Sequence, residues 1–236
     1  MDCLSVYFLS QTLSHLPADD RWLAAAERDR ASGFRFPKRR DDWLLGRWTA
    51  KQAVRFYLSL TGCEVPERAS LEIRSAPDGA PEAFLAGDPV PVALALSHCR
   101  DQGFCVVAAA GVALGCDLEA IERRDPPFIE DYFNDSERDL ITHAPAEEQP
   151  LLATLLWSAK ESALKCLREG LRRDTRSVVV SLSGARKPGW NPLTACCEES
   201  GRAFYGWWLS EVHWVQTILA IESVREPISI IRGMEP

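Results

Sequence analysis

An acidic pair with regular spacing stands near the middle of the chain. The segment 115–119, of sequence GCDLE, places Asp117 and Glu119 two residues apart among apolar neighbours. Side chains alternate between the two faces of a β-strand, so on a strand both carboxylates lie on one face. The alternative is an exposed strand whose carboxylates are simply solvated.

A second string further along has helical spacing. In the segment 157–165, of sequence WSAKESALK, Trp157, Glu161 and Lys165 recur every four residues, which places them on one face of a helix. Together with the acidic pair, these groups can hold a divalent cation and a polyphosphate, and hard oxygen ligands suit Mg²⁺. The alternative is a surface Glu161–Lys165 pair, but a tryptophan on the same face indicates burial.

The composition is that of a globular protein without the positive charge of a nucleic-acid binder. The chain has 236 residues, a length that suffices for one large domain or two small ones. Its residues are 46% hydrophobic and 26% charged, and its net charge is −7. No apolar stretch is long enough for a membrane helix and no signal sequence is evident, so we expect a cytoplasmic protein. The eight scattered cysteines lack CxxC spacing, which favours buried thiols over a zinc site or disulfides.

The charge is unevenly distributed along the chain. Residues 21–51 contain nine Lys or Arg and four acids, whereas residues 116–148 contain three Arg and eleven acids. The first segment suits phosphate and the second suits a metal or solvent. On a long helix expected from Pro37 to about Leu60, four basic residues fall on one side and could line a cleft. They are Arg40, Arg47, Lys51 and Arg55.

The patterns predict an α+β protein, because helices and strands do not alternate strictly. The other expected helices are 18–32, capped by Asp19 or Asp20, about 135–142, and 151–168, with Gly170 near its end. The expected strands are 4–9, 70–75, 92–96, 104–110, 112–119, 177–182, 203–209 and 213–222. Gly111 is expected to turn a hairpin between 104–110 and 112–119, and Pro126-Pro127 to lie in a loop. No sequence repeat is evident, although the order of elements in the two halves is similar.

The two strings, in this order and separation, resemble the signature pair of the Sfp-type 4′-phosphopantetheinyl transferases. Those motifs read roughly G-(I/V)-D-(I/V/L)-E and W-x-x-K-E-(A/S)-x-x-K. Three other segments are similar to parts of the same family: the basic segment 34–47, the strand 94–98 ending in Ser-His, and the segment 133–137, of sequence FNDSE. The likeness runs from about residue 27 to residue 168.

This resemblance implies a pseudo-dimer of two similar α+β halves with the active site in the cleft between them. The implied halves are residues 1–111, which would bind the nucleotide of coenzyme A, and residues 112–236, which would hold the metal and the catalytic groups. The implied activity is the Mg²⁺-dependent transfer of 4′-phosphopantetheine from coenzyme A to a serine of an apo acyl or peptidyl carrier protein, as in a holo-[acyl-carrier-protein] synthase. Adenosine 3′,5′-bisphosphate would be released, and the two-half length implies a monomer.

The resemblance also implies catalytic and metal-binding roles for the two strings. Asp117, Glu119 and Glu161 would bind the metal, and Glu161 could instead, or also, be the general base that takes the proton of the carrier serine. Lys165 would contact the pyrophosphate and stabilise the charge of the leaving phosphate. Lys160, about 100° from Glu161 around the helix, is expected to face outward.

A basic set in the first half would bind coenzyme A. It consists of Arg40, Arg47, Ser97 and His98, with Lys51 as a weaker candidate, since arginine suits bidentate phosphate contacts. For His98 the alternative is an ordinary histidine at a strand end. Ala80 stands where family members often carry a nucleotide-contacting lysine.

Three points stay open in the sequence. The apolar run Phe128, Ile129, Tyr132 and Phe133 either docks the carrier protein or packs under its own loop. The chain is either an active transferase or a degenerate relative that only binds coenzyme A or a carrier, and a metal-dependent nucleotide phosphohydrolase fits the same chemistry. The carrier, whether of fatty-acid, polyketide or nonribosomal-peptide synthesis, is not specified.

Overall fold

The computed structural model describes residues 3–169 and 172–230, and the chain divides into two compact units. One unit is built on residues 6–111 and the other on residues 112–227, and each takes a short segment from the opposite end of the chain. Both units combine helices with mainly antiparallel sheets, so the predicted α+β class is confirmed. Within the described ranges, no helix has both the length and the apolar composition needed to cross a membrane.

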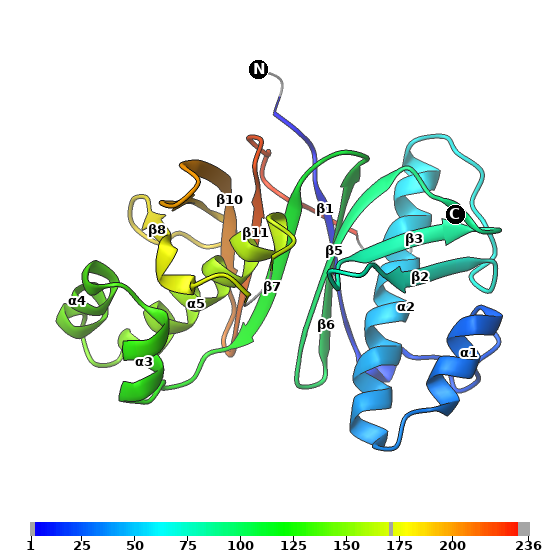
Figure 1. Ribbon diagram of the computed structural model, residues 1–236, viewed down its shortest axis with the longest axis horizontal. Helices are drawn as coiled ribbons and strands as arrows, with labels where there is room; N and C mark the ends of the chain where they lie inside the picture. Colours follow the sequence, from blue (N-terminus) through cyan, green and yellow to red (C-terminus); the bar gives the residue numbers. More distant parts are fainter. Residues whose placement is uncertain (1–2, 170–171, 231–236) are drawn as a thin grey trace. The chain divides into compact units, whose positions relative to one another are not determined.

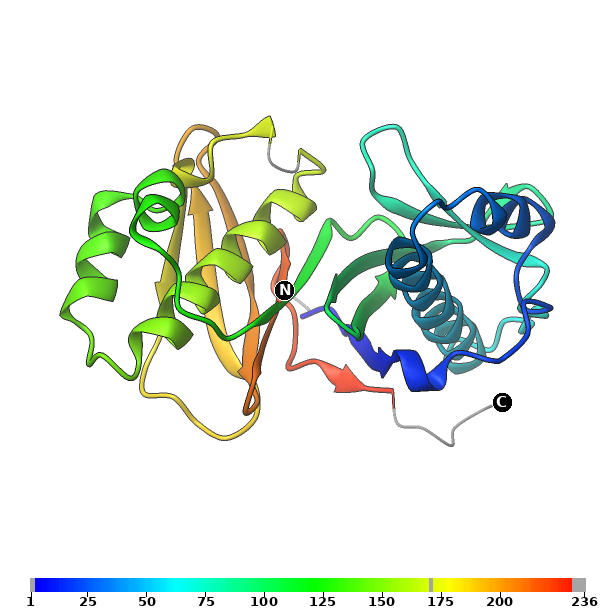
Figure 2. The ribbon, with the colours of Figure 1, turned by 90° about the horizontal axis from the view of Figure 1, so that it is seen from below.

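In the N-terminal unit a long helix packs on a four-stranded sheet (Figures 1 and 2). The helix α2 (Pro37–Leu60) has the predicted bounds, because proline is favoured at the first helical position. The sheet has the order β12-β1-β6-β5, with strands β1 (Tyr7–Thr12), β5 (Val92–Cys99), β6 (Gln102–Ala109) and β12 (Ile228–Ser229). A smaller antiparallel sheet contains β2 (Leu71–Ser75), β3 (Pro81–Leu85) and β4 (Asp88–Pro89). Apolar residues of α2, β1, β2 and β6 form the core of this unit.

The helix predicted at 18–32 is shorter than expected. Its N-terminal part is a turn in which Asp19 accepts from the amide of Arg21 at 3.1 Å, so Asp19 caps no helix. The helix α1 is Ala25–Ser32, and Glu27 in its first turn accepts from the amide of Ala24 at 2.9 Å. The glutamate therefore caps the helix that an aspartate was expected to cap.

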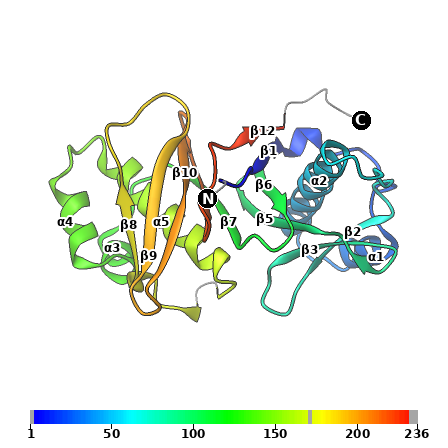
Figure 3. The same ribbon diagram turned by 90° about the horizontal axis from the view of Figure 1, so that it is seen from above.

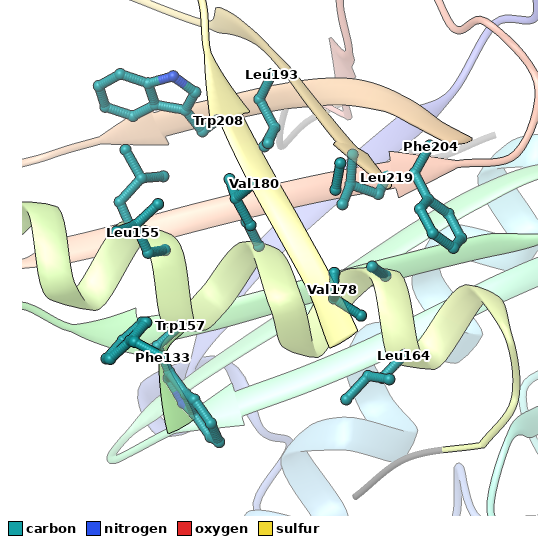
Figure 4. Close-up of a cluster of buried hydrophobic side chains, with 14 of the residues drawn as sticks. Phe133, Leu155, Trp157, Leu164, Val178, Val180, Leu193, Phe204, Trp208 and Leu219 are labelled. Carbon is teal, nitrogen blue, oxygen red and sulfur yellow. The ribbon is translucent and has the colours of Figure 1, made fainter. Parts of the chain in front are cut away.

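In the C-terminal unit one long helix, α5 (Gln149–Cys166), covers a five-stranded antiparallel sheet of order β7-β11-β10-β9-β8 (Figure 3). The strands are β7 (Leu114–Ala120), β8 (Val178–Leu182), β9 (Asn191–Cys197), β10 (Arg202–Ser210) and β11 (Trp214–Ala220). Two shorter helices, α3 (Pro126–Tyr132) and α4 (Asp135–His143), precede α5. The core lies between α5 and the sheet, where Leu155, Leu164, Val180, Leu193 and Phe204 meet (Figure 4).

Two sequence predictions about connections are wrong. No hairpin joins 104–110 to 112–119, because β6 pairs with β1 and β5 while β7 pairs with β11. The expected loop at Pro126-Pro127 is the start of α3, where Asp125 accepts from the amide of Phe128 at 3.0 Å and the prolines fill positions that need no amide donor. Gly170, expected near the end of α5, lies outside the described residues.

Candidate active site

The strand β7 carries the acidic pair on the face that α5 covers. Asp117 is opposite Thr217 of β11 and is 4% exposed. Gly115 lies on the same face, and a Cβ added there would stand 1.9 Å from the carbonyl oxygen of Ser162 in α5. The glycine of the first motif therefore permits the close approach of helix and strand that brings the two motifs together.

The helix α5 brings Lys165 onto the same strand. Its Nζ donates to Oδ1 of Asp117 at 2.8 Å and to the carbonyl oxygen of Cys116 at 2.9 Å. Burial opposes the charge of Lys165, but Asp117, Cys116 and Glu161 together outweigh it, so the pKa of Lys165 lies above its ordinary value. The lysine is therefore a fixed positive charge at this site.

Glu119 is held by two donors. Oε1 accepts from Nε1 of Trp157 at 3.0 Å, and Oε2 accepts from Nη2 of Arg124 at 3.0 Å. Burial, reinforced by the charge of Asp117, raises the pKa of Glu119, while Arg124 and Trp157 act in the opposite direction. Trp157 is thus buried, as predicted, and supports the strand as well as the helix core.

Arg124 is a site residue that sequence reasoning missed. Its guanidinium binds Glu119 and Glu122 and lies 4.8 Å from the ring centroid of Phe128. The available signal was a basic pair, Arg123 and Arg124, directly after an acidic strand. The contact itself depends on the path of the loop that follows β7, which no local pattern encodes.

The site shifts the pKa of Glu161 well above that of an ordinary carboxyl group. Burial raises the pKa of Glu161 to about 7, the nearby charges of Asp117 and Glu119 add to this effect, and Lys165 opposes it. Its Oε1 is buried and has no hydrogen-bond partner among the described residues. A carboxylate with a pKa near neutrality and an unused oxygen is suited to accept a proton or to bind a cation.

The donor set fits Mg²⁺ in type, since Asp117, Glu119 and Glu161 supply carboxylate oxygens and Oε1 of Glu161 is unpartnered. Within residues 3–169 and 172–230, however, no three His, Cys, Asp or Glu side chains form a group able to hold a metal ion. Lys165 and Arg124 instead contact oxygens of Asp117 and Glu119. The three-carboxylate metal set therefore stays a prediction.

The expectation that Lys160 faces outward is wrong. Its side chain is fully buried and lies 2.7 Å from Oε2 of Glu137. The helix is covered by α4 on that side as well as by the sheet, so the face judged to be solvent-exposed lies in the interior. In the apolar run after Pro127, Phe133 is fully buried, whereas Phe128, Ile129 and Tyr132 are only partly buried against the same core, so carrier docking by this run stays a prediction.

The basic residues of the N-terminal unit differ in their burial and in their hydrogen-bond partners. Arg47 donates to Oγ of Ser75 at 3.3 Å, lies 4.7 Å from the ring centroid of Trp43, and has a buried Nε without a hydrogen-bond partner among the described residues. Burial lowers the pKa of Arg47, and an incompletely paired guanidinium of this kind suits an anion. Arg40 is half-exposed, 3.9 Å from Asp41.

Lys51, the weaker candidate for coenzyme A, is ruled out as a phosphate ligand. It is fully buried and paired with Glu27, so its charge is already neutralised within the unit. Ser97 and His98 lie near the end of β5, and His98 is exposed. The assignment of Arg40, Arg47, Ser97 and His98 to coenzyme A stays a prediction.

Comparison with known proteins identifies one family. Residues 113–213 match the model of the 4′-phosphopantetheinyl transferase superfamily, and no curated protein matches the chain. Among solved structures, a Bacillus anthracis str. Ames holo-(acyl-carrier-protein) synthase in complex with CoA (3′,5′-ADP) has a TM-score of 0.36 and 20% identity, over 46% of this chain and 97% of that one. The Thermotoga maritima holo-[acyl-carrier-protein] synthase (AcpS) has a TM-score of 0.37 and 18% identity, over 60% of this chain and 91% of that one.

The family match covers β7 and α5, the two elements that carry Asp117, Glu119, Glu161 and Lys165. It agrees with the resemblance that the two motifs carry. The assignment to the Sfp-type subfamily is supported by the motifs and not by the family match. The segment of residues 113–213, which contains the candidate active site, is therefore similar to the 4′-phosphopantetheinyl transferase superfamily both in its match to the family model and in its two motifs.

Proposed function

We propose that this protein transfers the 4′-phosphopantetheine arm of coenzyme A to a serine of an apo carrier protein and releases adenosine 3′,5′-bisphosphate. The observation that carries the proposal is the convergence of the two motifs. Lys165 contacts Asp117, and the charges of Asp117 and Glu119 act on Glu161, all within the segment that matches the superfamily. A cytoplasmic location and a monomeric state are part of the proposal.

In this reaction Glu161 would take the proton from Oγ of the carrier serine, directly or through water, as that oxygen bonds to the pantetheine-side phosphorus of the pyrophosphate. The bridging P–O bond breaks, and the electron pair leaves with the adenosine bisphosphate. The pKa of Glu161 near 7 supports this role, because a base with a pKa close to ambient pH is both deprotonated and able to hold a proton. Within the same proposal Glu161 would also, or instead, be a ligand of the metal.

Lys165 would stabilise the negative charge that develops on the leaving phosphate. Its raised pKa keeps the ammonium charged at neutral pH, and its bond to Asp117 holds it in place before substrate binds. Preorganised charges of this kind lower the barrier because they need no rearrangement during the reaction.

A bound Mg²⁺ would neutralise the pyrophosphate and polarise the phosphorus that is attacked. Asp117, Glu119 and Glu161 would hold it, since carboxylate oxygens suit this ion. Arg40, Arg47, Ser97 and His98 would bind the nucleotide part of coenzyme A, and the buried unpartnered Nε of Arg47 supports an anion at that position.

The test is incubation with a fluorescent coenzyme A analogue, Mg²⁺ and a panel of apo carrier proteins from fatty-acid, polyketide and nonribosomal-peptide synthesis. The proposal expects covalent labelling of at least one carrier by the wild type and none by Glu161→Gln. Binding of coenzyme A without labelling would identify a degenerate binding module. Release of adenosine 3′,5′-bisphosphate without labelling would identify a phosphohydrolase. Either outcome would overturn the proposal.

A further inference from the structure

A buried ion pair joins α5 to α4 and to the start of β8. Lys160 and Glu137 are 0% and 3% exposed, and Nζ lies 2.7 Å from Oε2. The ammonium also donates to the carbonyl oxygens of Thr175 and Val178 at 2.9 and 2.6 Å, while Oε1 of Glu137 accepts from the amide of Val180 at 3.3 Å. All three protons of Lys160 therefore have partners within the protein.

The N-terminal unit contains the same arrangement. Lys51 of α2 pairs with Glu27 of α1, with 0% and 3% of their side chains exposed. Nζ of Lys51 donates to the carbonyl oxygens of Trp22 and Arg68 at 3.0 and 2.9 Å. Oε1 of Glu27 accepts from the amide of Ile73 in β2 at 2.9 Å. In each unit the pair thus links the long helix, the short helix before it and the strand after it.

The two glutamates also have the same local role. Glu27 and Glu137 both lie in the first turn of their helix, and Oε2 of each accepts from the amide of the capping residue, Ala24 at 2.9 Å and Asn134 at 3.1 Å. Each carboxylate is therefore fixed by its own helix before the lysine reaches it. The ion pair therefore holds the long helix that carries the lysine, α2 or α5, against the short helix that carries the glutamate.

The correspondence extends to the sequence as a short repeat in the two long helices. Residues 48–52 read WTAKQ and residues 157–161 read WSAKE, and both tryptophans are buried. The two helices differ at the groups proposed to react. Gln52 of α2 occupies the position of Glu161 in α5, and Phe56 occupies the position of Lys165. The buried lysine is common to both helices, whereas the reactive groups occur in one of them.

We propose that Lys160 and Glu137 form a positioning pair for the transfer reaction, fixing α5 so that Glu161 faces Asp117. The inference rests on the proposed function. Lys160 does not act on a substrate, because it is fully buried and its donors are used within the protein. It directly precedes Glu161, so a shift of this turn moves the carboxylate, and a misplacement of about 1 Å can cost about a hundredfold in rate.

The test compares Glu137→Gln with the matched control Glu27→Gln. Each variant removes the negative charge that is paired with a buried lysine and keeps one acceptor oxygen for the strand amide, so both variants lose the same acceptor for the cap amide. We expect Glu137→Gln to lower kcat for the transfer by about tenfold or more per folded molecule, with KM for coenzyme A within about twofold of wild type. Glu27→Gln should keep kcat within about twofold. Circular dichroism and urea unfolding give the folded fraction, which separates lost structure from lost positioning. Equal values of kcat in the two variants would overturn the inference.

A second readout does not depend on activity. In protein labelled with 5-fluorotryptophan, the ¹⁹F signals of Trp157 and Trp48 are assigned by their Phe variants. Trp157 is hydrogen-bonded to Glu119, so its signal reports how α5 lies on β7. We expect Glu137→Gln to shift the Trp157 signal and leave that of Trp48 unchanged, and Glu27→Gln to do the reverse. An unmoved Trp157 signal in Glu137→Gln overturns the positioning role.

The two readouts separate this inference from the proposed function. Absence of transfer by the wild type, with every carrier, contradicts the function, and the ¹⁹F spectra then decide whether the pair positions α5. Transfer by the wild type with full kcat in Glu137→Gln contradicts the positioning role and leaves the function intact.

Discussion

Lys165 donates from Nζ to Oδ1 of Asp117 at 2.8 Å, a bond that joins α5 to β7 across 48 positions of the sequence. It ties the lysine of one motif to the first acid of the other. The bond also directs the positive charge of Lys165 to Asp117, which leaves Glu161 in a buried position with two acidic neighbours and a pKa of about 7. The raised pKa of Glu161 thus follows first from its burial and then from its acidic neighbours.

Glu161→Gln should abolish transfer and stabilise the fold. Ionised Glu161 is disfavoured by burial and by Asp117, and a neutral amide of the same size removes that cost. At pH 8 in metal-free buffer we expect a gain in the free energy of unfolding of roughly 1–3 kcal/mol, measured by urea titration. Coenzyme A affinity, followed by calorimetry, should persist. Unchanged turnover in this variant would remove Glu161 from the mechanism.

The pH dependence of both activity and stability follows from the same group. Since Glu161 must be ionised to accept a proton, kcat/KM should fall as the pH drops through the pKa of Glu161, which bound Mg²⁺ should place below the metal-free value of about 7. Its folded-state pKa lies above the ordinary value of 4.5, so between these values the folded state holds a proton that the unfolded state has lost. The free energy of unfolding should therefore decrease as the pH rises through this window. A profile of unfolding free energy that is identical for wild type and Glu161→Gln would contradict the assignment.

Arg124→Gln should increase the affinity of the site for divalent cations. Arg124 now pairs with Oε2 of Glu119, so a cation that binds this carboxylate must displace a guanidinium. Removing that competitor should strengthen binding of Mn²⁺, measured by electron paramagnetic resonance without substrate, by about tenfold, which corresponds to about 1.4 kcal/mol. Arg138→Gln, at an exposed pair with Asp135, is the control and should change nothing. Weaker Mn²⁺ binding by Arg124→Gln would show that the arginine supports the site.

Gly115→Ala should destabilise the C-terminal unit severely. Its Cβ would stand 1.9 Å from the carbonyl oxygen of Ser162. The clash is between the backbone of β7 and the backbone of α5, so no flexible side chain can move aside to relieve it. We expect a loss of about 3 kcal/mol or more in the free energy of unfolding. Gly46→Ala is the control, because a Cβ there meets nothing within 4 Å and alanine is favoured in a helix by about 1 kcal/mol. Urea unfolding that ranks the two variants equally would contradict the predicted contact between β7 and α5.

Much of the candidate site could be predicted because its signals are local. The alternation of Asp117 and Glu119 and the four-residue spacing of Glu161 and Lys165 each specify a face of one element. Pro37 marks the start of α2 in the same way. Such patterns need no knowledge of which element packs against which.

What the sequence did not reveal depends on contacts between distant segments. Lys160 was expected outside because it lies about 100° from Glu161 around the helix, and nothing local indicates that α4 brings Glu137 to that side. The strand 112–119 was expected to pair with the preceding strand 104–110, whereas β7 pairs with β11. The strand β9 was not predicted, and it contains Pro192, a residue type that is unusual inside a sheet. The repeat shared by α2 and α5 is short, and only the matching ion pairs of the structure make it recognisable.

The most direct test of the central claim is the intact mass of an apo carrier protein before and after incubation with coenzyme A, Mg²⁺ and this protein. The account predicts that the carrier gains the mass of one phosphopantetheine with the wild type, that the gain requires Mg²⁺, and that Glu161→Gln produces none. A carrier mass that stays unchanged across the whole panel, with correctly folded wild-type protein, would contradict it.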